Sequence, residues 1–186
     1  MSAPSLLEAD LMAASKSASD RVGPAREHTF TWGDPVAAAA AGRGLTGREI
    51  LEAIVARRIS APPAASLVGF WIDVVDEGRV EMILEPAEYM YNTIGSLHGG
   101  IVATLLDSVM GCAVWTLLDA HTAHATLEIH ANFVRPATVA TGPLRAIGRV
   151  LHLGSRTATA ESRMVDTNAR LYAHGSTTCL LTPRDV

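Results

Sequence analysis

The residues best placed for chemistry lie in one segment, YNTIGSLHGGIVATLLDSVMG, residues 91–111. Small and aliphatic residues make up most of it, yet it carries a single carboxylate, Asp107, and the triplet His98-Gly99-Gly100. A carboxylate can act as a general base or a nucleophile, and backbone amides at a helix start can hold an oxygen that becomes negative. This combination could serve a reaction in which a bound oxygen acquires negative charge.

Asp107 is expected to lose hydration because its neighbours in the segment are leucine, valine and methionine. A desolvated carboxylate persists only if it is paired, hydrogen-bonded or functional. The alternative is a structural carboxylate, bonded for example to the adjacent Ser108. We favour a catalytic role, because partly desolvated carboxylates are good bases and nucleophiles.

Gly99 and Gly100 open the expected helix, where free N–H groups lie at the positive end of the helix dipole. Glycine lets another molecule approach this backbone closely, so the segment could bind a substrate carbonyl. Two glycines could equally serve only to pack the helix start tightly against a sheet.

His98 and Asp107 are 107 − 98 = 9 positions apart. On a helix this corresponds to roughly 13 Å of rise and about half a revolution. The two side chains therefore cannot easily reach one small reacting group from the same chain. If both are catalytic, the site needs the helix start of one subunit and the aspartate of another, which a two-fold dimer supplies twice.

The rest of the pattern predicts the elements that position these residues. A helix is expected over 45–59, with Thr46 as its N-cap and Glu49 completing a capping box. The alanine run 36–41 could be a helical turn or an adaptable segment. Two strands joined at Asp76-Glu77-Gly78 follow, then a long helix over about 97–118. Four strand-like runs come last, separated by turns at 135–136, 154–155 and 166–168.

A long helix that is apolar round most of its circumference must be surrounded, and a curled antiparallel sheet would do this. In the run ATLEIHANF, a period of two divides the residues between two faces. The apolar face carries Leu127, Ile129, Ala131 and Phe133. The polar face carries Thr126, Glu128, His130 and Asn132.

The composition narrows the class of protein. A chain of 186 residues with net charge −4 is near the size of one domain and lacks the basic excess of nucleic-acid-binding proteins. Cys112 and Cys179 lack the spacing of a metal site or a disulfide framework. The N-terminal segment has acidic residues where a signal peptide would need a basic start and an unbroken apolar stretch, so a cytoplasmic location is expected.

Segment 99–118 is long enough to span a membrane, but Asp107 and the strands that follow favour a buried helix. We expect an N-terminal arm over 1–45 and one domain over 46–186.

The segment NTIGSLHGGIVATLLD resembles the signature of PaaI-like acyl-CoA thioesterases of the hotdog fold, of the phenylacetate-pathway type. The resemblance extends over about residues 66–181, through ATLEIHANFVRPA and GRVLHLGSRTATAESRMVD. It implies an α+β fold in which a five- or six-stranded antiparallel sheet wraps a long central helix. It also implies dimers as the catalytic unit, assembled further into tetramers, and hydrolysis of an acyl-CoA thioester.

Carried over by position, the resemblance makes Asp107 the general base or nucleophile. The backbone N–H of Gly99 would polarise the thioester carbonyl, with His98 and Asn92 orienting groups beside it. Thr126 would help to hold the attacking water. Taken without the family, Asn92 could be a turn residue, His98 a helix-start hydrogen-bonder and Thr126 an ordinary strand residue.

CoA carries phosphates, so an acidic protein must supply local donors. We expect the substrate to contact Gly100 and the hairpin turn Gly154-Ser155-Arg156, with Arg135 and Arg149 as further candidates. The acyl pocket could include several other side chains of the central segments: Tyr89, Met90, Met110, Trp115, Glu128, His130 and Asn132.

Three functions compete. The first is an acyl-CoA thioesterase for aryl or medium-chain acyl groups, working without a metal or other cofactor and without nucleic-acid or membrane partners. The second, a hotdog hydratase or dehydratase, needs an Asp and a His close together in one short segment, which the spacing does not supply. The third, a non-catalytic acyl-CoA binding or sensing module, predicts loss of the carboxylate or of the helix-start glycines, and both are present.

Overall fold

The computed structural model describes residues 24–184, so the first 23 residues of the expected N-terminal arm lie outside the described part. Within it the chain forms short helices, two strands, one long helix and four strands, which confirms the expected order. The helices are α2 (Pro35–Ala41), α3 (Gly47–Val55), α4 (Pro63–Val68) and α5 (Gly99–Trp115). The strands are β1 (Phe70–Asp76), β2 (Arg79–Leu84), β3 (Thr122–Phe133), β4 (Leu144–Leu153), β5 (Thr157–Val165) and β6 (Leu171–Pro183). Single 3-10 turns span Glu88–Met90 and Val139–Thr141.

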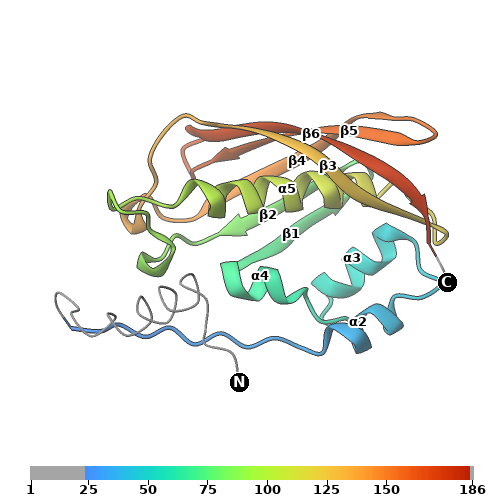
Figure 1. The fold of residues 1–186 in the computed structure, drawn as a ribbon, viewed down its shortest axis with the longest axis horizontal. Helices are drawn as coiled ribbons and strands as arrows, with labels where there is room; N and C mark the ends of the chain where they lie inside the picture. The colour runs from blue at the N-terminus through green and yellow to red at the C-terminus, as the bar shows by residue number, and fades with distance from the viewer. Residues whose placement is uncertain (1–23, 185–186) are drawn as a thin grey trace, which may run out of the picture.

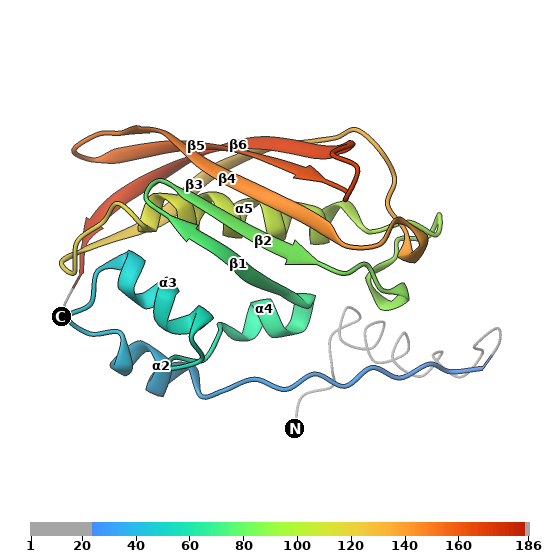
Figure 2. The same cartoon turned by 180° about the vertical axis from the view of Figure 1, so that it is seen from behind.

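The six strands form one antiparallel sheet in the order β1-β2-β4-β5-β6-β3. The sheet curves over α5, which lies along its concave side (Figures 1 and 2). Strands β1 and β3 are therefore the two edge strands of this sheet. This is the central helix and wrapped sheet that the sequence predicts.

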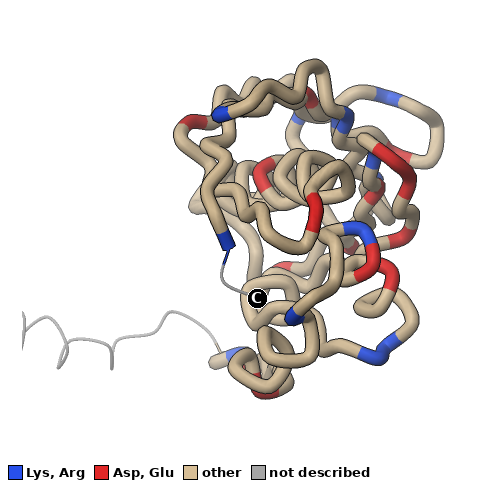
Figure 3. Tube along the Cα trace, turned by 90° about the vertical axis from the view of Figure 1, so that its right-hand side faces the viewer, with Lys and Arg blue, Asp and Glu red and all other residues tan. Residues whose placement is uncertain are grey.

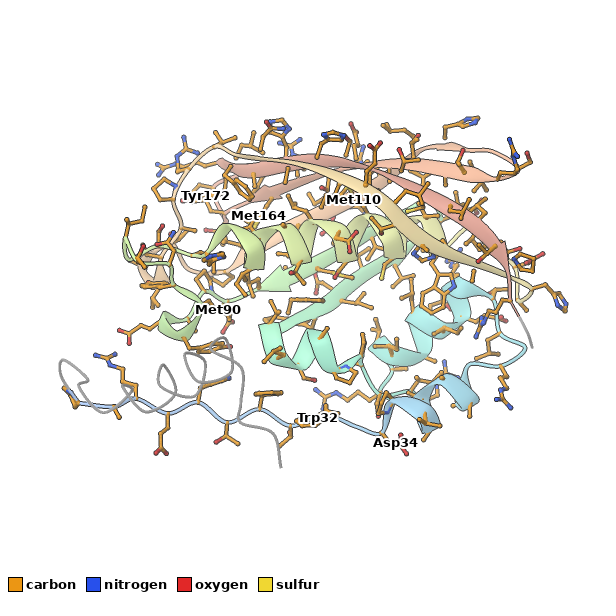
Figure 4. All side chains as sticks on the ribbon, in the orientation of Figure 1. Trp32, Asp34, Met90, Met110, Met164 and Tyr172 are labelled. Atoms are coloured by element: carbon orange, nitrogen blue, oxygen red, sulfur yellow. The ribbon has the colours of Figure 1, made fainter. Side chains whose placement is uncertain are left out.

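The core lies between α5 and the sheet. Met110 and Met164 project into this layer (Figure 4), and each is at most 1% exposed. The buried side of α5 has helical spacing: Val102, Leu105, Leu106, Val109, Met110, Ala113 and Val114. The helix is shorter than the predicted 97–118, since His98 has extended dihedral angles (φ −64°, ψ 134°) and acts as the N-cap.

Helix α5 approaches β4 very closely. A Cβ atom on Gly148 would lie 2.4 Å from the carbonyl oxygen of Val109, so only glycine fits at this crossing. The far end of α5 is fixed by Thr116, whose hydroxyl donates to the Ala113 carbonyl (2.6 Å) and accepts from the Gly78 amide (2.8 Å). Gly78 has φ 68° in the β1–β2 turn, as the hairpin prediction requires.

The N-terminal helices cover the side of α5 that the sheet leaves open. They lie beside β1, and the segment before α2 runs beneath α4 (Figures 1 and 2). The alanine run 36–41 is helical and lies in α2, whose N-cap Asp34 accepts hydrogen bonds from the amides of Val36 and Ala37. Helix α3 begins with the predicted capping box of Thr46 and Glu49. Within residues 24–184, no helix is long and apolar enough to cross a membrane.

Replacing Thr46 by alanine tests whether this cap holds α3 in place. The Thr46 hydroxyl accepts from the Glu49 amide, so its loss should lower the free energy of unfolding by about 1 kcal/mol, measured by denaturant titration. Thr46→Ser keeps the hydroxyl and should remain within a few tenths of a kcal/mol of the wild type. Equal losses in both variants would contradict the role of the cap.

Candidate functional site

Asp107 lies on the side of α5 that faces away from the core and is only half-buried. This corrects the expectation of a carboxylate enclosed by its neighbours, because Leu106 and Val109 are fully buried while Asp107 is not. Its Oδ1 atom accepts a hydrogen bond of 2.8 Å from the hydroxyl of Thr126 on β3. Among residues 24–184, Oδ2 has no hydrogen-bond partner and remains free to accept a proton.

A β-bulge places Thr126 next to Asp107. The pairing of β3 with β6 shifts between Thr126, opposite Cys179, and Glu128, opposite Thr178, so that Leu127 is the extra residue. Thr126 therefore faces α5, not the polar outer face to which strict alternation assigns it together with Glu128. The polar face prediction was wrong for Thr126, because periodicity cannot show a bulge.

Asp107 and Thr126 open into a cavity of about 640 Å³. Its walls come from α3, α4, β1, β2, α5 and β3, so the N-terminal helices enclose it. The polar lining near the carboxylate includes Ser108 and His124, and most other lining side chains are apolar: Leu51, Ile54, Val55, Ile59, Phe70, Trp71, Ile72, Met82 and Trp115.

Two further ionisable groups lie close to Asp107. Burial lowers the pKa of His124, while the charge of Asp107 opposes this shift, so the imidazole favours its neutral form. Burial raises the pKa of the Cys112 thiol to about 12, and Asp107 adds to the effect. Cys112 is thus a protonated thiol near neutral pH, and a protonated thiol is a poor nucleophile.

The start of α5 presents one free donor. The Nδ1 atom of His98 accepts from the Gly100 amide (2.9 Å), so His98 occupies that donor and Gly100 is not free to bind substrate through its N–H. The Gly99 amide, at the first position of the helix, donates to no acceptor within residues 24–184. The ring of Phe133 lies over Gly99, where an added Cβ would be 3.4 Å from it.

Asn92 organises the loop before the helix. Its Oδ1 atom accepts from the amides of Ile94 (3.0 Å) and Ser96 (3.1 Å), and its Nδ2 donates to the Ser96 hydroxyl. Asn92 also lines a separate cavity of about 280 Å³ with Gly99 and Phe133. Its amide is engaged in the turn, so its main local effect is to position the helix start.

The helix start and the carboxylate are not brought together within one chain. Gly99 and Asn92 line the smaller cavity, whereas Asp107 and Thr126 line the larger one. The predicted turn Gly154-Ser155-Arg156 joins β4 to β5 and lines neither cavity.

The alternative basic residues differ in their surroundings. Arg135 donates to the Leu171 carbonyl (2.5 Å) and lies 5.5 Å above the Tyr172 ring, whereas Arg149 is exposed on β4. In the described part of the chain, arginine positions are interspersed with Asp and Glu in the view of Figure 3. Within residues 24–184, no three His, Cys, Asp or Glu side chains are grouped as metal ligands.

Sequence reasoning missed part of this site. His124 lies two residues before Thr126 on the same side of β3, so its position could have been inferred once Thr126 was chosen. No pattern in the sequence indicated that α3 and α4 would form a wall of the Asp107 cavity. Of the other side chains suggested for an acyl pocket, Trp115 lines the Asp107 cavity, and the remaining ones do not.

Comparisons with known proteins agree with this architecture. A family model described as the Thioesterase superfamily matches residues 94–173, which include Gly99, Asp107 and Thr126. A protein of Halobacterium salinarum whose name proposes esterase activity is 31% identical over 105 residues, 54% of this chain and 68% of that protein. The 1,4-dihydroxy-2-naphthoyl-CoA hydrolase of Escherichia coli is 28% identical over 122 residues, 63% of this chain and 88% of that enzyme.

Solved structures share the fold. A thioesterase family protein of Silicibacter pomeroyi has a TM-score of 0.64 at 26% identity, covering 72% of this chain and 96% of that one. The PaaI protein of the Escherichia coli phenylacetic acid degradation operon has a TM-score of 0.62 at 22% identity, covering 73% and 94%, which is a likeness of fold alone. The central helix, the wrapped antiparallel sheet and these relatives confirm the resemblance read from the sequence: the chain belongs to the thioesterase superfamily and is a thioester hydrolase of the hotdog fold.

Proposed function

We propose that the protein hydrolyses an acyl-CoA thioester, with an aryl or medium-chain acyl group, to the free acid and CoA. The observation that carries the proposal is the hydrogen bond from Thr126 to Asp107 at the edge of a largely apolar cavity. The carboxylate supplies the reacting group and the cavity suits a hydrocarbon acyl group. A relative named as a naphthoyl-CoA hydrolase supports both the CoA thioester and an aromatic acyl group.

Asp107 acts best as a general base in this arrangement. Thr126 holds Oδ1, which leaves Oδ2 to take a proton from a water molecule while that water attacks the thioester carbonyl carbon. The carbon–sulfur bond then breaks and CoA leaves as a thiolate, which takes up a proton. Direct attack by Asp107 on the carbonyl remains the alternative route, through an acyl-enzyme anhydride.

The Gly99 amide is the proposed donor to the carbonyl oxygen. It is free of protein acceptors in the described residues and lies at the positive end of α5. Because Nδ1 of His98 accepts a hydrogen bond, the neutral ring carries its proton on Nε2 and can donate beside Gly99. Asn92 positions this start through its loop.

A dimer through β3 would complete the site. Strand β3 is an edge strand with large apolar side chains, including Leu127 and Phe133, exposed by 59% and 57%. Thr126 contacts Asp107, and Phe133 contacts Gly99, seven positions or roughly 23 Å further along the strand. Antiparallel pairing of two β3 strands about a two-fold axis midway would bring Thr126 of one subunit to Phe133 of the other. Asp107 would then meet the other subunit's Gly99.

The CoA phosphates need a basic side chain as a contact. We retain Arg156 as the proposed contact, because its turn is exposed and its backbone carbonyl is fixed by the Leu181 amide (2.8 Å). A tetramer of two such dimers also remains a proposal.

Replacing Asp107 by asparagine should lower kcat by about 10²- to 10⁴-fold, because the general base is lost. The measurement is release of the CoA thiol from a panel of aryl and straight-chain acyl-CoAs, with thermal unfolding to verify the fold. Asp119→Asn, the same change at an exposed aspartate outside this cavity, should keep wild-type turnover. Wild-type rates in Asp107→Asn would refute its role, and binding of acyl-CoA without turnover by the wild type would favour the sensing module.

Gly99→Pro removes the proposed donor with little damage to the helix. Proline is tolerated at the first helical position, and His98 already has the extended dihedral angles that suit a residue before proline. We expect kcat to fall about 10²- to 10³-fold relative to Gly99→Ala, which keeps the N–H. Equal rates in the two variants would exclude the amide as the oxyanion donor.

Coexpression of the Asp107→Asn and Gly99→Pro chains tests whether each active site uses residues of two subunits. In a dimer of one Asp107→Asn chain and one Gly99→Pro chain, one site would combine both defects and the other would be intact. Coexpressed chains should therefore regain about a quarter of wild-type activity, if assembly is random and each site uses both subunits. Activity no greater than that of the separate variants would place Asp107 and Gly99 in different sites.

A further inference from the structure

A second cavity lies directly behind the one that holds Asp107. It has a volume of about 440 Å³ and is enclosed by α2, α3, the segment before α4 and the start of β3. Part of its lining is shared with the larger cavity, including Ile54, Ile59, Trp115 and His124. These side chains therefore form a partition between two adjoining spaces, each within the usual size range of ligand pockets.

Two aromatic rings make up one side of the partition. Trp115 is the last residue of α5, and its ring centroid lies 6.1 Å from that of His124 on β3, at an interplanar angle of 56°. Gly47, the first residue of α3, fits against Trp115, since an added Cβ would be 2.3 Å from its Cδ1 atom. The indole is thus wedged between the end of α5 and the start of α3.

The second cavity has the chemistry of a hydrocarbon site. Its lining is mainly aliphatic: Pro35, Ala38, Ala39, Ile50, Ile54, Ile59, Ala61, Pro62, Pro63 and Ala123. Its one arginine, Arg184, is already engaged, donating to the carbonyl of Gly42 (3.0 Å). His124 favours its neutral form, so Arg184, with its guanidinium held by backbone carbonyls, is the one charged side chain of this lining.

We propose that Trp115 and His124 form the end wall of the acyl pocket and thereby limit the length of the acyl group. The cavity behind them would take the distal methylenes of a long fatty acyl chain once the indole is removed. This inference rests on the proposed function, because it assumes that the acyl group enters the cavity beside Asp107. Trp115 is therefore a specificity-determining residue, and it takes no part in the chemistry.

The wall is a feature of this chain beyond the family core. The family model matches residues 94–173, whereas α2, α3 and the residues before α4 lie between 35 and 63. Trp115 and His124 belong to the matched region, but Gly47, Ile54 and Ile59, which complete the partition, do not. The length limit thus depends on the N-terminal helices.

The test compares kcat/KM for a series of straight-chain acyl-CoAs, from butanoyl to hexadecanoyl, in the wild type and Trp115→Ala. The wild-type profile should fall off at the longer chains. In the variant, the ratio of kcat/KM for hexadecanoyl-CoA to that for octanoyl-CoA should rise about tenfold or more, since each newly buried methylene contributes about fourfold. Trp32→Ala is the matched control, because Trp32 is 57% exposed and lies on the segment before α2 (Figure 4).

Two further variants test the end wall without relying on Trp115→Ala alone. Ile54→Ala opens the same partition from α3 and should shift the profile in the same direction, which covers the case of a Trp115→Ala protein that does not fold. Adding Ala38→Phe to Trp115→Ala should refill the second cavity and restore the wild-type profile.

The outcomes separate the inference from the function beneath it. If the opened variants hydrolyse acyl-CoAs with an unchanged profile, or if Trp32→Ala shifts it equally, the end wall is refuted and the proposed function stands. If the wild type hydrolyses no acyl-CoA of the series or the aryl panel, the proposed function itself fails.

Discussion

The structure depends on the close approach of α5 to β4. At Gly148 the two backbones touch, because a Cβ there would lie 2.4 Å from the Val109 carbonyl. With the helix at this depth, its apolar side fills the space beneath the curved sheet and cannot rotate without removing large side chains from the core. The opposite side, which carries Asp107, is thereby turned toward the N-terminal helices and the site.

Strand β3 links the two halves of the proposed site. It contacts the carboxylate through Thr126, near the middle of the strand, and the helix start through Phe133 at its end, and it is also an edge strand of the sheet. An exposed edge strand with apolar side chains is prone to pair with another chain. In the proposed dimer, the same strand would therefore supply the contact to Asp107, the pairing surface and the distance between them.

Much of the fold could be predicted, because it follows from local patterns. The capping box at Thr46, the glycine at position 78 and the apolar length of α5 each have a short-range cause. The nine-residue separation of His98 and Asp107 likewise showed that one chain could not join them. The half-exposure of Asp107 and the wall of α3 and α4 could not be predicted, because both depend on how distant elements pack.

The bulge at Leu127 shows that strand length matters here as much as residue identity. The extra residue shifts the alternation of the strand by one position. Before the bulge the even-numbered residues of β3 face the helix, and after it the odd-numbered residues do. Losing that single residue would turn the Thr126 hydroxyl to the outside if the downstream pairing were kept, although every side chain of the site would still be present. A relative aligned without a gap at this point need not therefore share the site geometry.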